Sequence, residues 1–115
     1  MAVCGALALA PGPTRAAERL CGWLHNPTPA NYWLTDRATQ WTLSEQGGSA
    51  VPGFDDLPDM ARYGWVVTNG DSYGYGCACL LADVDRRAGR VIRVIKAEPV
   101  PLRKCRNDRR LPQPG

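Results

Sequence analysis

Hydrophobic and polar residues alternate with a period of two in several short stretches of the chain. The clearest stretches are residues 31–35, 41–45 and 90–96, and residues 63–68 and 77–84 have similar character. All are rich in aromatic, β-branched or other apolar side chains. This period and composition are typical of β-strands that bury one face. The pattern therefore predicts five strands in these places.

Turn signals between the stretches predict how they pair. Polar residues 36–40 separate 31–35 from 41–45 and indicate a β-hairpin, and residues 85–89 indicate another hairpin before 90–96. Asn69-Gly70 is a strong turn signal because both residues tolerate positive φ. Pro99 and Pro101 end the last strand, after which we expect residues 102–105 to fold back.

Three loops are expected beside these elements. Residues 21–24 begin the structured region, and residues 25–29, with two prolines, are predicted to form a rigid loop that stops this first segment. Residues 51–62 are predicted to be a long loop with one helical turn at 59–62. The glycine-rich residues 70–76 indicate close backbone approach or a bulge. A phosphate-binding loop is disfavoured there because no Lys-Ser/Thr follows and the next segment reads as a strand.

These elements define a fold class. About five or six short strands, with 12 Gly and 10 Pro and little room for helix, predict a small all-β protein, either an antiparallel sheet or a partly closed barrel. We expect a single β domain over residues 17–110 and a disordered tail over 111–115. A chain of this size buries only about two thirds of its surface, so covalent cross-links such as disulfides would contribute much to its stability.

The N-terminal segment resembles an export signal. Residues 4–11 are apolar and are followed by small residues at Thr14 and Ala16, although Met1-Ala2-Val3 carries no basic residue. We interpret residues 1–16 as a signal peptide remnant or a flexible arm. A lipid anchor on Cys4 is a less favoured alternative. No apolar run reaches the roughly 18 residues that span a bilayer, so no transmembrane span is predicted.

Four cysteines remain after such a leader. They are Cys21, Cys77, Cys79 and Cys105, and an even set in a small exported domain indicates disulfides. A bridge between Cys77 and Cys79 is disfavoured because alternate residues of one strand lie too far apart. Two pairings remain open, and each ties Cys21 and Cys105 to the central pair.

Metal and thiol chemistry are the competing interpretations of the cysteines. A zinc site would use Cys77 and Cys79 with Cys21 or Cys105 and with His25, but a one-residue gap is uncommon for paired zinc ligands. A thiol or redox enzyme would use the same two cysteines, with His25 as the only histidine available as a base. We predict neither metal nor cofactor, and no catalytic residue.

Charge is unevenly distributed. Residues 1–85 hold four basic and nine acidic side chains, whereas residues 86–110 hold ten basic and two acidic ones. Such a basic segment is able to bind a polyanion through counterion release. We favour a simpler interpretation, in which residues 90–96 expose their charges on the wet side of a strand and pair with the acidic part of the fold. Nucleic-acid binding is therefore disfavoured.

Aromatic residues supply the candidate binding site. Trp33 and Trp41 flank one turn and are expected to pair across strands. An exposed subset of the remaining rings would form a stacking platform. The residues that we select for binding are Trp23, Asn26, Asn31, Tyr73 and Tyr75.

Specific sequence blocks also resemble a known family. The most specific are Asn26-Pro27-Thr28-Pro29 and Gly74-Tyr75-Gly76-Cys77-Ala78-Cys79. Further blocks are residues 21–23, 33–37, 41, 46–48, 65–70, 101–102 and 105–106. Together they are similar to the small exported bacterial proteins known as domain of unknown function 4087. The resemblance implies an exported protein with no established activity.

The sequence thus predicts a non-catalytic binding module of the bacterial periplasm or envelope, or an extracellular one. Its partner would be a protein, peptide or glycan. The alternative is a thiol or redox enzyme, or a zinc module, that uses Cys77 and Cys79. The oligomeric state stays open.

Overall fold

The computed structural model describes residues 17–114 of the chain. Six strands form its framework: β1 (Glu18–Thr28), β2 (Asn31–Thr35), β3 (Gln40–Ser44), β4 (Val66–Asn69), β5 (Tyr73–Asp85) and β6 (Arg90–Val100). The helical elements are short: a 3-10 turn η2 (Phe54–Asp56) and a helix α1 (Leu102–Arg106). In residues 17–114 no helix has the length and hydrophobicity to cross a membrane.

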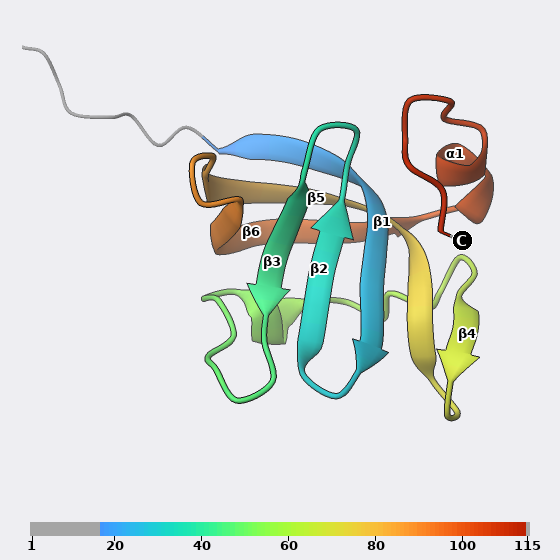
Figure 1. Ribbon diagram of the computed structural model, residues 1–115, viewed down its shortest axis with the longest axis horizontal. Coiled ribbons are helices and arrows are strands. Elements are labelled where there is room, and N and C mark those ends of the chain that lie inside the picture. The colour runs from blue at the N-terminus through green and yellow to red at the C-terminus, as the bar shows by residue number, and fades with distance from the viewer. Residues whose placement is uncertain (1–16, 115) are drawn as a thin grey trace, which may run out of the picture.

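Five of the strands form a ring, as Figure 1 shows. β1, β2 and β3 form an antiparallel meander, β6 and β5 form the opposite side, and β5 returns to pair with β1. This order, in which a later strand lies beside the first of three consecutive ones, is a Greek key. The prediction of a small all-β fold is confirmed, and of the two predicted forms, a sheet and a partly closed barrel, the ring corresponds to the barrel. One pairing corrects the antiparallel expectation, because β3 and β6 meet in parallel at Thr42 and Arg90.

Strand lengths differ from the prediction of short strands. β1 and β6 have 11 residues each and β5 has 13. The length has a structural reason, since β5 pairs with β1 along one edge and with β4 and then β6 along the other. A short strand has too few residues for three partners.

The rigid loop predicted at residues 25–29 is wrong, because β1 continues to Thr28. His25 pairs with Trp33 on β2, and Asn26 pairs with Gly74 on β5. Proline is tolerated here because the β1–β2 register is irregular between His25 and Thr28, where the missing N–H of Pro27 costs no ladder bond.

Two layers of apolar side chains hold the molecule together. Alternate residues of β1 and β5 point into the ring, where Leu20, Leu24 and Leu80 pack with Leu34 and Trp41. The residues between them point outward and form a second, smaller cluster, in which Trp23 packs with Cys77, Cys105 and Leu111 beneath α1. Leu111 is 4% exposed and the side-chain amide of Gln113 donates to the carbonyl of Cys105, so packed contacts continue past residue 110, the domain end that we predicted.

Residues 51–62 form the predicted long loop, and this loop covers the barrel core. Val51, Phe54 and Leu57 pack against the core, and the N–H of Val94 donates to the carbonyl of Pro52 at 2.9 Å. The helical turn lies at η2, and residues 60–63 form only hydrogen-bonded turns, so the turn predicted at 59–62 is misplaced. Apolar burial of Phe54 against the core accounts for the difference.

The predicted hairpins are confirmed, but the predicted Trp33–Trp41 pair is wrong. Trp33 lies opposite Thr42, and Trp41 lies opposite Leu34, so the two tryptophans point to opposite faces of the sheet. Trp41 is buried in the barrel, where its indole N–H donates to Asp36 at 2.8 Å. Trp33 stands on the outer face.

Candidate functional site

Three aromatic side chains form a row across the outer face of the barrel. His25 on β1 lies opposite Trp33 on β2 and opposite Tyr75 on β5. The ring centroids of His25 and Trp33 are 5.3 Å apart with an interplanar angle of 21°, and those of His25 and Tyr75 are 5.6 Å apart. All three side chains are half-buried. We call Trp33, His25 and Tyr75 the aromatic stripe.

A buried tryptophan supports one end of the aromatic stripe. Trp23 meets Tyr75 edge to face at 5.2 Å and is 1% exposed. Its indole N–H has no hydrogen-bond partner among the described residues. At the centre of the stripe, burial lowers the pKa of His25 below its ordinary value.

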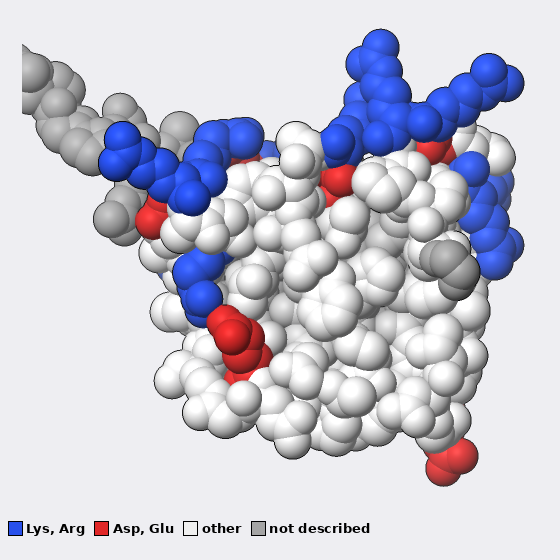
Figure 2. All heavy atoms as spheres, viewed as in Figure 1, with Lys and Arg blue, Asp and Glu red and all other residues white. Residues whose placement is uncertain are grey.

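The surroundings of the aromatic stripe carry little charge. Figure 2 shows that the face over β1 and β2 is nearly free of Lys, Arg, Asp and Glu, whereas Lys and Arg gather along the upper and right-hand edges. A row of aromatic rings in a neutral face suits an uncharged ligand, since no buried charge has to be matched.

The structure brings one of the five predicted binding residues into the aromatic stripe, namely Tyr75. Trp23 lies beneath it. Tyr73, at the start of β5, makes none of the aromatic contacts of the stripe within residues 17–114. Burial of Tyr32 raises the pKa of Tyr32, and the electrostatic interaction with Tyr73 raises it further. A binding role for these residues stays a prediction.

The two predicted asparagines hold the β1–β2 turn. The side-chain amide of Asn26 donates to the carbonyls of Thr28 and Asn31, at 2.9 and 3.0 Å. The amide of Asn31 donates to the hydroxyl of Thr28, and its carbonyl oxygen accepts from the N–H of Gln46. Their polar groups are thus occupied within the fold.

His25 and Trp33 are the stripe residues that sequence reasoning missed. Their alignment depends on β1 continuing past Leu24, which the prolines of residues 25–29 concealed. The signal that would have found them is the spacing of Trp23 and His25. These residues are two apart, so on a continuous strand both side chains point to the same face.

Both predicted disulfides are confirmed, and the structure selects one of the two open pairings. Cys21 bonds to Cys79, directly opposite it on β5, and Cys77 bonds to Cys105 on α1. Cys21 is exposed, whereas Cys77 and Cys105 are 3% and 2% exposed. Among residues 17–114 no group of three or more His, Cys, Asp or Glu side chains is placed to hold a metal ion.

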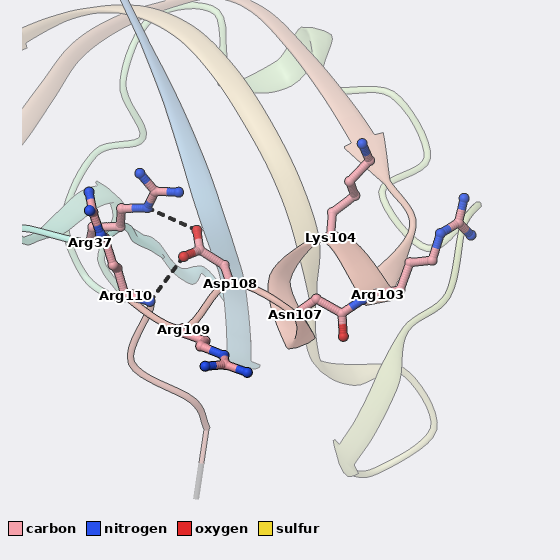
Figure 3. Close-up of a pocket in the computed structure, with 7 residues that line it drawn as sticks. All are labelled: Arg37, Arg103, Lys104, Asn107, Asp108, Arg109 and Arg110. Atoms are coloured by element: carbon pink, nitrogen blue, oxygen red, sulfur yellow. Dashed lines mark hydrogen bonds and ion pairs between the residues drawn. The ribbon is translucent and has the colours of Figure 1, made fainter.

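A second surface is a basic cleft beside α1. It has a volume of about 590 Å³ and is lined by Arg37, Arg103, Lys104, Asn107, Asp108, Arg109 and Arg110. Figure 3 shows Arg37 and Arg110 next to Asp108 on one side, with Lys104 and Arg103 on α1 at the other. The guanidinium of Arg37 donates to Asp108 at 2.9 Å and holds the pKa of that carboxyl below its ordinary value.

Fold and surfaces together define a small disulfide-stapled Greek-key barrel with an outer aromatic stripe and a basic end. The chain belongs to the family described as Protein of unknown function (DUF4087), which it matches over residues 15–112. No curated protein and no solved structure matches it. The resemblance found in the sequence is thereby confirmed, and the family description assigns no activity.

Proposed function

We propose that this protein is a non-catalytic binding module of the bacterial periplasm or envelope, and that it binds a glycan chain through the aromatic stripe. The observation that carries the proposal is the contact row of Trp33, His25 and Tyr75 on three adjacent strands.

The rigidity of the aromatic stripe supports a binding role. Its three rings stand on paired strands of the closed ring, and Tyr75 is braced by buried Trp23. Aromatic side chains that are already held in place lose little conformational freedom when a ligand binds. A binding surface built on strands is also positioned more accurately than one built on loops.

The chemistry of the face supports a glycan as the ligand. Sugar rings present apolar C–H groups that pack on aromatic side chains, and their hydroxyls carry no formal charge. The face over β1 and β2 carries few charged side chains (Figure 2), and the stacked rings of His25 and Trp33 stand on these two strands. An acidic or basic peptide would meet few complementary charges there.

Export is the second part of the proposal, and the disulfides support it. Cys21–Cys79 and Cys77–Cys105 link segments that are 58 and 28 residues apart in sequence. Such bonds persist in oxidising compartments and are rare in the cytosol of mesophiles.

The thiol and zinc alternatives have no specific observation in their favour. Cys77 and Cys79 bond to different partners, so the two do not form a paired dithiol. Free-thiol titration of the exported protein tests these alternatives. Two or more reactive thiols would revive them, and none is the result that the present proposal expects.

The binding proposal is tested by cosedimentation of the full chain with insoluble peptidoglycan. We expect retention, and we expect Trp33→Ala and Tyr75→Leu each to weaken it at least tenfold, which corresponds to about 1.4 kcal/mol. Tyr63→Ala is the matched control, because Tyr63 is 50% exposed and makes no contact with the stripe rings in the described residues. Thermal melting checks that each variant is folded.

Three results would overturn the proposal. They are no retention of the wild type on any glycan polymer, an equal loss with Tyr63→Ala, and retention by peptides in place of glycans.

A further inference from the structure

Eight of the ten Lys and Arg side chains in residues 86–110 form two groups in the structure, and Arg87 and Lys96 belong to neither group. In the first group each arginine pairs with a carboxylate: Arg86 with Glu18, Arg90 with Glu45 and Arg93 with Asp83. The pairing expected from the sequence therefore holds for these positions.

The second group is not neutralised in this way. It consists of Arg103, Lys104, Arg106, Arg109 and Arg110, which we call the basic cluster. All five are exposed, and none forms an ion pair within residues 17–114. The one carboxylate of this segment, Asp108, is already engaged by the guanidinium of Arg37 and the backbone N–H of Arg110. The cluster therefore carries excess positive charge at one end of the molecule.

The basic cluster stands on a rigid support. α1 is bonded to β5 through Cys105 and Cys77, and Leu111 is buried in the cluster of apolar residues beneath the helix. The side-chain amide of Gln113 donates to the carbonyl of Cys105 at 3.0 Å. Five positive charges on one short segment repel one another. A ligand of opposite charge would relieve this repulsion, and the fixed support keeps the five side chains together for such a ligand.

The spread of the cluster indicates the shape of that counter-charge. In Figure 3 Arg103, Lys104 and Arg109 project in different directions around the open cleft and do not converge on one point. This arrangement suits several anionic groups distributed over a surface better than a single small anion. Four of the five side chains are arginines, whose planar guanidinium matches phosphate oxygens in a bidentate geometry.

We propose that the basic cluster docks the protein on the phosphate groups of an anionic lipid surface. The choice of lipid over nucleic acid rests on the export part of the proposed function, because an exported protein meets the lipid surfaces of the envelope, and an anionic lipid surface attracts clustered Lys and Arg. The lipid surface and the glycan would bind different faces, so the two proposals fail independently.

The test is cosedimentation of the full chain with vesicles of phosphatidylglycerol and phosphatidylcholine, and with vesicles of phosphatidylcholine alone. We expect binding only to the anionic vesicles, and weaker binding as salt is raised. Arg109→Gln with Arg110→Gln should weaken it about 25-fold, since each cation near such a surface contributes about fivefold.

The matched control is Arg90→Gln with Arg93→Gln, which lowers the net charge by the same amount. Those arginines already have carboxylate partners, so we expect less than a threefold change. Equal losses in the two double variants would overturn the proposal, because total charge would then explain binding.

Two further arms separate the sources of phosphate. Free pyrophosphate should compete only weakly if a surface is the ligand, and complete displacement by it at equal phosphate concentration would contradict the proposal. A single-stranded oligonucleotide that binds more tightly than the anionic vesicles would also overturn it. Retention on peptidoglycan should be the same in the Arg109→Gln, Arg110→Gln variant as in the wild type.

Discussion

The environment of His25 in the fold differs from the one that its sequence context predicts. In the sequence it precedes Asn26-Pro27 and reads as a loop residue. In the structure it lies between Trp33 and Tyr75 at the centre of the aromatic stripe. Burial there disfavours the charged imidazolium, so the neutral ring is the form that the fold stabilises.

This burial predicts a pH dependence of stability. The pKa of His25 is lowered in the folded state from its ordinary value of 6.5, so between the two pKa values the unfolded chain binds more protons. The contribution to the free energy of unfolding is therefore complete above pH 6.5 and is lost as the pH falls toward the folded pKa. His25→Phe should remove it.

Urea unfolding of the wild type and His25→Phe between about pH 5 and pH 8 measures the effect. His25 is the only histidine of the chain, and other groups cancel in the difference between the two proteins. The wild type should lose more stability than the variant as the pH falls. Parallel pH profiles would contradict the assignment.

At the scale of the elements, the start of β5 depends on close backbone contacts. A Cβ atom added at Gly74 would lie 1.8 Å from the carbonyl oxygen of Val66 on β4, and one added at Gly76 would lie 2.7 Å from the ring of Trp65. The close approach predicted for this glycine-rich segment is confirmed. Tyr75 lies between these two glycines, and Gly74 pairs with Val67 on β4 and with Asn26 on β1.

Gly74→Ala should therefore lower the free energy of unfolding by about 1–3 kcal/mol, which is the usual range for overpacking in a tight site. Gly48→Ala is the control, since its Cβ would have 3.5 Å to the nearest atom and its φ is not positive. Denaturant unfolding of both variants measures the difference. Similar stabilities would show that β4 moves aside at little cost.

The elements also show which parts of the fold the sequence was able to predict. The β2–β3, β4–β5 and β5–β6 hairpins were found because each has a local turn signal next to alternating strands. The pairing of β1 with β5 joins residues 18–26 to residues 74–82, and no local signal carries such a distant contact. Because of Pro27 and Pro29, the prediction ended the first segment at Leu24 and placed His25 in a loop. The prediction therefore did not bring His25 next to Trp33.

At the scale of the whole molecule, two disulfides link β5 to other elements, one to β1 within the ring and one to α1 outside it. Cys21–Cys79 links β1 to β5, and Cys77–Cys105 attaches α1. In the chain-entropy description, loops of 58 and 28 residues give stabilisations of about 4 kcal/mol each. That is a large fraction of the net stability of a small domain.

The two disulfides should differ in their response to a thiol reductant. Cys21 is exposed, while both sulfurs of the other bond belong to residues that are at most 3% exposed. Graded reduction followed by alkylation and mass mapping should label Cys21 and Cys79 first, while the native fold persists. Earlier labelling of Cys77 and Cys105 would contradict their burial in the smaller apolar cluster beneath α1.

For the molecule as a whole, we propose that a glycan binds at the neutral aromatic stripe and not at the basic end. The most direct measurement is the map of backbone and indole NMR shifts of isotope-labelled protein during titration with soluble peptidoglycan fragments. We predict saturable shifts centred on His25, Trp33 and Tyr75, with residues 103–110 unchanged. Shifts confined to residues 103–110, or no shifts at all at saturating fragment, would contradict it.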